Sequence, residues 1–251
     1  IAGEFFSQGI KSFTLLVGIS NDPREVLSKL EHIRLGFEEI EKQYGDSRHG
    51  QVRLTITRRK DGSIKNTTPQ NLEEALYFLD KNPQILSRLD GFDFSGEENP
   101  KLLEPTLALL SILLDHNKYR QKKQKKQHAI SIHAGESCFD FSPEDNLYAF
   151  EKLLPLGWSN LSHGTFLWLP SQLLPLPKSD ERDRQRLLLQ CSDTKKILEI
   201  CPTSNILLTP MESFEDIPLR FFEDNSITYT INTDNPTLFS TTLAQERQKV
   251  G

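Results

Sequence analysis

Hydrophobic positions along the chain follow two periods, which predict strands and helices in turn. The apolar residues 12–19 predict a buried strand, and Asp22 and Pro23 are residue types that favour the start of a helix. From Val26 to Ile40 the apolar positions recur every three or four residues and form one helical stripe. The pattern therefore begins with a strand followed by an amphipathic helix.

The same pair of elements recurs along the chain. Further strands are predicted within residues 52–57, 85–94, 129–132, 158–161, 196–201 and 226–231. Helical patterns lie between them, including residues 142–154, 182–190 and 214–224, whereas the Pro- and Leu-rich residues 170–178 predict a loop. Strands that alternate with helices in this way are typical of βαβ units and a parallel sheet.

Polar or glycine-containing clusters follow nearly every predicted strand. In a (β/α)8 barrel the carboxyl ends of all strands face one mouth, where such side chains meet. An open doubly wound sheet would concentrate them at one switch point instead. We therefore expect an α/β protein with the fold of a (β/α)8 TIM barrel, in which residues 1–251 form a single domain.

Composition sets limits on the class of protein. The chain has 251 residues, 36% of them hydrophobic and 26% charged, which suits a globular barrel. A formal net charge of -5 gives no basic field that would favour nucleic acid. No apolar run reaches the roughly 20 residues that span a bilayer, and residues 1–6 do not resemble a signal peptide. With three cysteines and no CxxC motif, the chain is expected in the cytoplasm, without a membrane partner.

Residues 131–136 carry the most specific candidate chemistry. The strand predicted at residues 129–132 ends on His133, two small residues and Glu136. A neutral imidazole can bind zinc, and a nearby glutamate can transfer a proton. By themselves these residues fit a structural histidine at least as well, so the other strand ends decide between the two interpretations.

Taken in order, the strand-end motifs resemble those of the adenosine deaminase family, within the metal-dependent amidohydrolase barrels. The resemblance covers the central and C-terminal part of the family's barrel. The similar segments are residues 92–98 (Asp-Leu-Ala-Gly-Asp-Glu in the family), 131–136 (His-Ala-Gly-Glu), 162–164 (Gly-His-Gly), 199–205 (Glu-x-Cys-Pro-x-Ser-Asn), 217–220 (His-Pro-Leu-Arg) and 232–236 (Asn-Thr-Asp-Asp-Pro). Motifs in this order, each near a predicted strand end or the last helix, indicate homology.

The resemblance implies zinc-dependent deamination of adenosine, or of a related adenine nucleoside or nucleotide, to the inosine-type product and ammonia. His133 and Asp234 are then ligands of one zinc ion, which lowers the pKa of its water toward about 7. His163 is expected to orient or deprotonate that water. A protonated Glu136 is expected to donate a proton to the purine ring. The catalytic residues implied are therefore Glu136, His163 and Asp234.

The resemblance also implies contacts to the substrate. The backbone at Gly96 is expected to contact a ring nitrogen, and Asp93 either touches the substrate or fixes the loop that presents Gly96. Asn235 stands where the family has a second Asp, whose carboxyl group helps to read a purine nitrogen. Because an amide carries neither proton nor charge there, strict specificity for adenosine is not expected. Ser162 replaces a glycine and is expected to narrow the pocket slightly.

One family motif is missing from the chain. The family takes two more metal ligands from a His-x-His on its first strand, and none of the six histidines here has that spacing. The strand predicted at residues 12–19 matches the second strand of the family. We therefore expect this chain to be a segment of a longer polypeptide, with two further histidine ligands outside it.

Two alternatives to adenosine deamination stay open. The substrate could be a modified or phosphorylated adenine nucleotide if the basic residues 118–126 fold toward the barrel mouth. Otherwise this run is a solvated helix end or loop. Alternatively, the missing His-x-His motivates a catalytically impaired barrel that acts as a binding or assembly subunit, for example in phage defence, as a homo-oligomer or in a larger complex. A His-x-His upstream would favour the enzyme.

Overall fold

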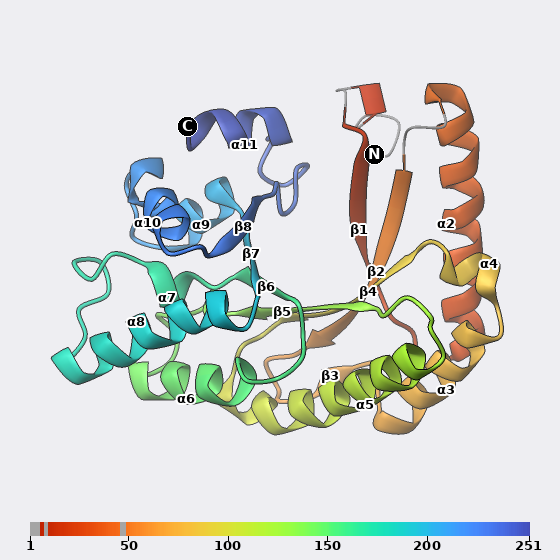
Figure 1. Ribbon diagram of the computed structural model, residues 1–251, viewed down its shortest axis with the longest axis horizontal. Coiled ribbons are helices and arrows are strands. Elements are labelled where there is room, and N and C mark those ends of the chain that lie inside the picture. The colour runs from red at the N-terminus through yellow and green to blue at the C-terminus, as the bar shows by residue number, and fades with distance from the viewer. Residues whose placement is uncertain (1–5, 8–9, 46–48) are drawn as a thin grey trace. The chain divides into compact units, whose positions relative to one another are not determined.

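The computed structural model describes residues 6–7, 10–45 and 49–251, and the chain divides into two compact units. The first unit comprises Ile1–Ser95 and Glu104–Ile130, and the second comprises Gly96–Leu103 and Ser131–Gly251. Figure 1 shows the strands and helices of both units. The single domain expected over residues 1–251 stays a prediction.

Among the described residues, four strands form the sheet of the first unit. Its strands are β1 (Ser12–Gly18), β2 (His49–Arg58), β3 (Ile64–Lys65) and β4 (Leu89–Gly96). β1 pairs in parallel with β2, and β4 lies on the other side of β2. The short β3 pairs antiparallel with the end of β2. The strands predicted at residues 12–19 and 52–57 are confirmed with small differences at their ends.

Most helices of the first unit begin at a proline, a residue type that favours helix starts. The helices are α2 (Pro23–Tyr44), α3 (Pro69–Asp80), α4 (Pro83–Leu86) and α5 (Leu103–Lys122). Asp22 accepts a hydrogen bond of 2.8 Å from the backbone of Arg24, and Pro23 takes the first helical position. The buried face of α2 includes Val26, Leu30 and Phe37, which confirms the predicted apolar stripe.

Apart from the buried Arg120, the basic residues at the end of α5 are a solvated helix end, as one of the two interpretations predicted. The helix stops at Lys122, and residues 121–127 are all exposed. Nζ of Lys126 lies 3.9 Å from Asp90, near the start of β4. The basic run therefore lies beside the amino end of this strand, whereas barrel enzymes place their chemistry at the carboxyl ends.

Four parallel strands form the sheet of the second unit. They are β5 (Ala129–Ala134), β6 (Asn160–His163), β7 (Ile197–Ile200) and β8 (Thr228–Ile231), paired in that order. The register sets His133 opposite Ser162, Ser162 opposite Glu199 and Glu199 opposite Thr230. Because side chains alternate between the faces of a sheet, these four residues form a polar row on one face.

Helices and turns of the second unit connect these strands. They are α6 (Pro143–Leu153), α7 (Thr165–Trp168), α8 (Lys178–Asp193), α9 (Pro202–Leu208), α10 (Leu219–Asp224), α11 (Leu243–Lys249) and the 3-10 turns Pro100–Leu102 and Phe214–Asp216. The single helix predicted at residues 214–224 is wrong. Pro218 lacks a backbone N–H, and a 3-10 turn and α10 lie on either side of it.

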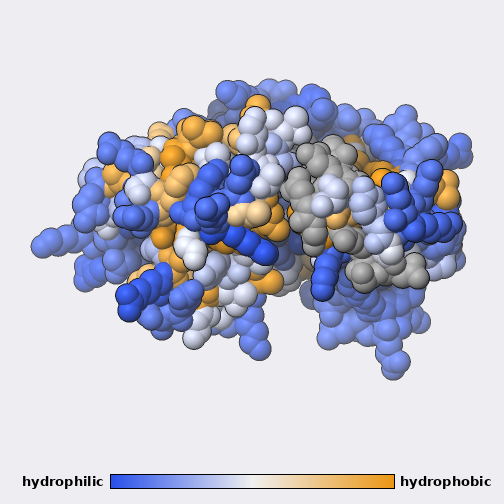
Figure 2. All heavy atoms as spheres, turned by 90° about the horizontal axis from the view of Figure 1, so that it is seen from above, coloured by the Kyte–Doolittle hydropathy of each residue, from blue (hydrophilic) through white to orange (hydrophobic). Residues whose placement is uncertain are grey.

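The surface carries both hydrophilic and hydrophobic side chains. On the face shown in Figure 2, hydrophilic residues predominate at the margins and hydrophobic residues gather in one part of the face. In the second unit, Leu207 is 65% exposed and Leu238 71% exposed. Among the helices of the described ranges, none combines the length and apolar character needed to cross a membrane.

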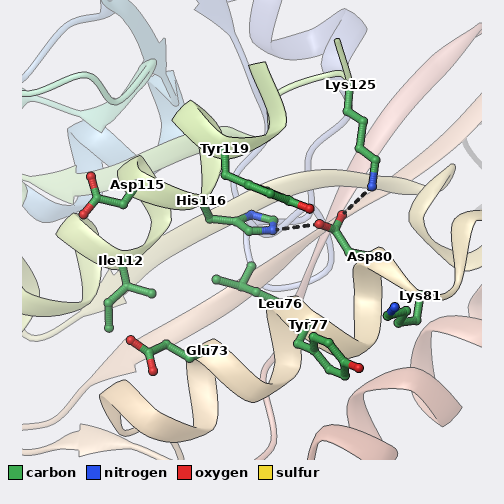
Figure 3. Close-up of a pocket in the computed structure, with 10 residues that line it drawn as sticks. All are labelled: Glu73, Leu76, Tyr77, Asp80, Lys81, Ile112, Asp115, His116, Tyr119 and Lys125. Carbon is green, nitrogen blue, oxygen red and sulfur yellow. Dashed lines mark hydrogen bonds and ion pairs between the residues drawn. The ribbon is translucent and has the colours of Figure 1, made fainter. Parts of the chain in front are cut away.

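A cavity of about 470 Å³ lies between α3 and α5 in the first unit (Figure 3). Asp80 binds several groups here: it forms an ion pair with Arg120 and lies 3.3 Å from Nε2 of His116 and 3.7 Å from Nζ of Lys125. The rings of His116 and His128 are stacked, with centroids 5.6 Å apart. Burial lowers the pKa of His116, and it lowers the pKa of His128 to about 3.

Acid is expected to destabilise the first unit through His128. An unfolded histidine titrates near pH 6.5. Below that pH the unfolded chain binds a proton at this residue, whereas the buried ring of the folded protein stays neutral until the pH approaches 3. The stabilising contribution is thus complete above about pH 6.5 and is lost as the pH falls from there toward 3. His128→Phe should reduce the loss of unfolding free energy between pH 7 and pH 5 by about 2 kcal/mol.

Urea unfolding at the two pH values measures this difference. His32→Phe is the matched control, because His32 lies exposed on α2. An acid sensitivity that is the same in the His128 variant and in the wild type would show that His128 is not its source.

Candidate functional site

Side chains from the ends of β5, β6 and β8 meet in the second unit. Glu136, His163 and Asp234 each offer one donor atom, and these atoms lie within 4.8 Å of one another. Nε2 of His163 is 3.4 Å from Oε1 of Glu136. The ring of His133 lies beside that of His163, with centroids 5.2 Å apart. We call these four residues, all predicted from the sequence, the strand-end cluster.

Two members of the strand-end cluster have a left-handed backbone. The φ angle is 64° at His163 and 53° at Asp234, in a region that non-glycine residues seldom adopt. Such residues persist only where the surrounding structure holds them, and they concentrate at functional sites. At His163 the indole of Trp168 donates to the backbone carbonyl at 2.8 Å. The side chain of His163 is only 2% exposed, so its position is firmly set.

The turn that carries Glu136 depends on a glycine. Gly135 has φ 76°, and a Cβ at this position would come within 2.9 Å of Phe166 and 3.0 Å of Phe150. Its carbonyl accepts a hydrogen bond of 2.9 Å from the backbone of Phe166. Only glycine allows this close approach, which explains why the residue before Glu136 is small.

Glu98 holds the other side of this turn. Its carboxylate accepts hydrogen bonds from the backbone N–H groups of Glu136, at 3.3 Å, and Ser137, at 3.2 Å. The turn is therefore fixed by Phe166 on one side and by a carboxylate on the other. Sequence reasoning did not assign this role, although Glu98 stands at the end of the segment similar to Asp-Leu-Ala-Gly-Asp-Glu.

Asn205 contacts His163 from the first turn of α9. Its Nδ2 lies 3.1 Å from Nδ1 of His163 and 3.2 Å from Oγ1 of Thr165. Its Oδ1 accepts a hydrogen bond of 3.0 Å from the backbone of Cys201. The structure shows a loop contact and, in addition, a direct contact with a predicted catalytic residue.

The polar row of His133, Ser162, Glu199 and Thr230 contains a hydrogen bond that the sequence did not reveal. The hydroxyl of Ser162 donates to Glu199 at 2.6 Å, and the amide of Asn160 donates to the same carboxylate at 2.8 Å. Ser162 was expected to narrow the pocket slightly. Its hydroxyl has the further role of hydrogen bonding to Glu199, the first residue of the segment at 199–205.

The residues expected to contact substrate are placed as follows. Gly96 has φ 85° and belongs to the second unit. Asn235 is exposed, and its Oδ1 accepts a hydrogen bond of 2.9 Å from the backbone of Leu238, which leaves its NH2 group to donate. Asp93 belongs to the first unit, where it is completely buried in β4. Their contacts with a substrate stay predictions.

Nitrogen and oxygen donors of this kind fit a divalent metal ion. Histidine and carboxylate side chains are common protein ligands of catalytic zinc. Glu136, His163 and Asp234 form such a group among the described residues. The expected ligand Asp234 belongs to this group, whereas the expected ligand His133 lies beside it through its contact with His163.

Comparison with known proteins places the chain in a family. The sequence pattern of the family described as adenosine deaminase matches residues 87–250. The chain is 27% identical to an adenosine deaminase of Vibrio vulnificus over 88% of the chain and 54% of that protein. It is 28% identical to an adenine deaminase of Rhizobium rhizogenes over 71% of the chain and 45% of that protein. The chain thus spans about half the length of the curated relatives it matches.

Solved structures confirm the predicted fold class. The apo N6-methyl-AMP deaminase of Arabidopsis thaliana is similar with a TM-score of 0.58 and 18% identity, over 98% of this chain and 63% of that one. At this identity the likeness concerns the fold, an α/β barrel of the adenosine and adenine deaminase type. Since the family pattern matches more than half of the chain, this protein belongs to the adenosine deaminase family.

Proposed function

We propose that this chain forms the central and C-terminal part of a zinc-dependent aminohydrolase that converts an adenine nucleoside or nucleotide to the inosine-type product and ammonia. The observation that carries the proposal is the strand-end cluster, in which Glu136, His163 and Asp234 bring donor atoms within 4.8 Å of one another. The cluster lies where barrel enzymes hold their chemistry, and the curated relatives are named adenosine or adenine deaminases.

His133 and Asp234 would hold the zinc ion, together with two histidines from outside this chain. When bound, zinc supplies a water of lowered pKa at neutral pH. The position of His133 supports this role, because its ring lies beside His163 and shares a sheet face with Ser162 and Glu199. The protein's contribution is to hold the donor atoms in place before the substrate arrives.

Glu136 and His163 would act on the substrate and its attacking water. Water adds to the amino-bearing carbon of the purine, and Glu136 donates a proton to the adjacent ring nitrogen. The bond from that carbon to the amino nitrogen then breaks. Of the two protons of the added water, one goes to the amino nitrogen, which leaves as ammonia, and the other restores the proton of Glu136. Nε2 of His163 lies 3.4 Å from Oε1 of Glu136, which supports a role for both residues at the same reacting atoms. The sum of the steps is one purine and one water converted to one hypoxanthine-type product and one ammonia.

A phosphorylated or modified adenine nucleotide is the second candidate substrate. The observation that favours it is the similarity of fold to an enzyme named N6-methyl-AMP deaminase. The basic residues 118–126 do not add support, because Lys126 pairs with Asp90 near the amino end of β4. The exposed NH2 group of Asn235 would favour a purine that offers an acceptor nitrogen at this point.

Replacing Glu136 with Gln in the longest native polypeptide tests the proposed function. The wild type should contain roughly one zinc per chain and should release ammonia from adenosine or an adenine nucleotide. Glu136→Gln should keep the zinc and lower kcat by about 10² to 10⁴, because an amide cannot supply the proton. Metal analysis and an ammonia assay over a panel of purines measure both quantities.

Glu144→Gln is the control for this experiment, since Glu144 is exposed at the start of α6. Zinc without turnover of adenosine would direct the search to nucleotides and modified bases. A polypeptide that includes the first barrel strand, yet holds no metal and turns over no purine, would contradict the proposal. The alternative of a binding or assembly subunit would then be favoured.

Glu98→Gln tests whether the turn that carries Glu136 is held by a carboxylate. Glutamine has one acceptor oxygen for two N–H donors, and its NH2 group would face the second of them. Amide hydrogen exchange at Glu136 and Ser137 should become faster, and kcat should fall by about tenfold to a hundredfold with KM less affected. Mass spectrometry of exchange and steady-state kinetics check the two effects. Glu97→Gln, one residue earlier in the same loop, is the control, and unchanged exchange in Glu98→Gln would refute the role.

A further inference from the structure

The amide group of Asn205 can take only one orientation. The backbone N–H of Cys201 donates to Oδ1 at 3.0 Å, and only the oxygen of the amide can accept this bond. Nδ2 therefore faces Nδ1 of His163 at 3.1 Å and Oγ1 of Thr165 at 3.2 Å. The backbone N–H of Asn205 also donates to the carbonyl of Cys201 at 2.8 Å, so two bonds join these residues. The side chain of Asn205 is completely buried.

This orientation decides which nitrogen of His163 carries the proton. An NH2 group can only donate, so Nδ1 of His163 must accept the bond with its lone pair. A neutral imidazole then carries its single proton on Nε2. Nε2 is the nitrogen that lies 3.4 Å from Glu136. His163 thus presents an N–H group to the strand-end cluster.

We propose that Asn205 is a positioning residue that fixes His163 as the Nε2–H tautomer. In this tautomer Nε2 has no lone pair with which to remove a proton from water. His163 therefore acts by donating a hydrogen bond that orients an oxygen atom of the reacting groups, and the alternative that it deprotonates the water is excluded. The tautomer follows from the hydrogen bonds alone, whereas the catalytic consequence rests on the proposed function.

The surroundings of the pair favour a single arrangement. Both His163 and Asn205 are buried, and their contacts join the end of β6 to the first turn of α9. The backbone of His163 is held by Trp168, and Thr165 binds the second hydrogen of the Asn205 amide. Rotating the amide by half a turn would bring its NH2 group to the backbone N–H of Cys201. Two donors would then face each other without an acceptor, which destabilises a buried site.

Asn205→Asp in the full-length polypeptide tests the proposal. The variant has the same shape and keeps an oxygen for the N–H of Cys201, but it presents an acceptor to Nδ1 of His163. In the wild type, ¹⁵N NMR of the histidine rings should show Nδ1 of His163 unprotonated and Nε2 protonated. In Asn205→Asp the resonance of Nδ1 should move to the range of a protonated nitrogen. Comparison with His163→Gln assigns the signals of His163 among those of the other histidines.

Asn146→Asp is the matched control. Asn146 is also buried in the second unit, and its NH2 group donates to the carbonyl of Ser142 at 3.1 Å. This variant introduces the same new carboxylate and should leave the His163 resonances unchanged. Thermal unfolding of both variants shows whether each remains folded.

Steady-state kinetics test whether the tautomer of His163 matters for catalysis. Asn205→Asp should lower kcat by about tenfold to a hundredfold with little change in KM. A proton on Nδ1 in the wild type would overturn the proposal. A switched tautomer with unchanged kcat would overturn the positioning role. If the polypeptide deaminates no purine while the wild-type tautomer is as expected, the proposed function fails and the assignment of the tautomer is supported.

Discussion

The parallel register of β5 to β8 is the constraint on which the strand-end cluster depends. It sets His133, Ser162 and Glu199 side by side on one face and brings the ends of the strands together. Side chains alternate between faces along a strand, so a slip of one residue would turn His133 and its neighbours to the opposite face. The apolar residues between them, such as Ile132 and Leu161, are completely buried and make such a slip costly.

Beyond the last paired residues of the strands, contacts other than the hydrogen bonds of the sheet hold the chain in place. Gly135 allows the close approach to Phe166, and Glu98 binds the next two backbone N–H groups. Trp168 and Asn205 hold His163 from two sides. A buried polar group without a hydrogen-bond partner destabilises the folded protein. A buried network of hydrogen bonds therefore favours the one arrangement in which every member has a partner. A preorganised arrangement is what stabilisation of developing charge in a reaction requires.

Local signals in the sequence predicted those parts of the fold that depend on neighbouring residues. The start of α2 follows from Asp22 and Pro23, and its buried face from the spacing of Val26, Leu30 and Phe37. The prediction of one helix over residues 214–224 was wrong. The apolar pattern continues across Pro218, but a proline has no backbone N–H to continue the helical hydrogen bonds. The helix α9 was not predicted, since it is short and directly follows β7.

At the candidate site, the sequence by itself determined the residue types and the strand ends to which they belong. The candidate residues His133, Glu136, His163 and Asp234 follow from motifs, because each motif joins a strand to a chemical group within a few residues. Only the tertiary structure showed the contact of Asn205 with His163 and that of Glu98 with the turn of Glu136. Both contacts join segments about 40 residues apart. Hydrogen bonds over such separations depend on how the strands and helices pack, which no local pattern of residues records.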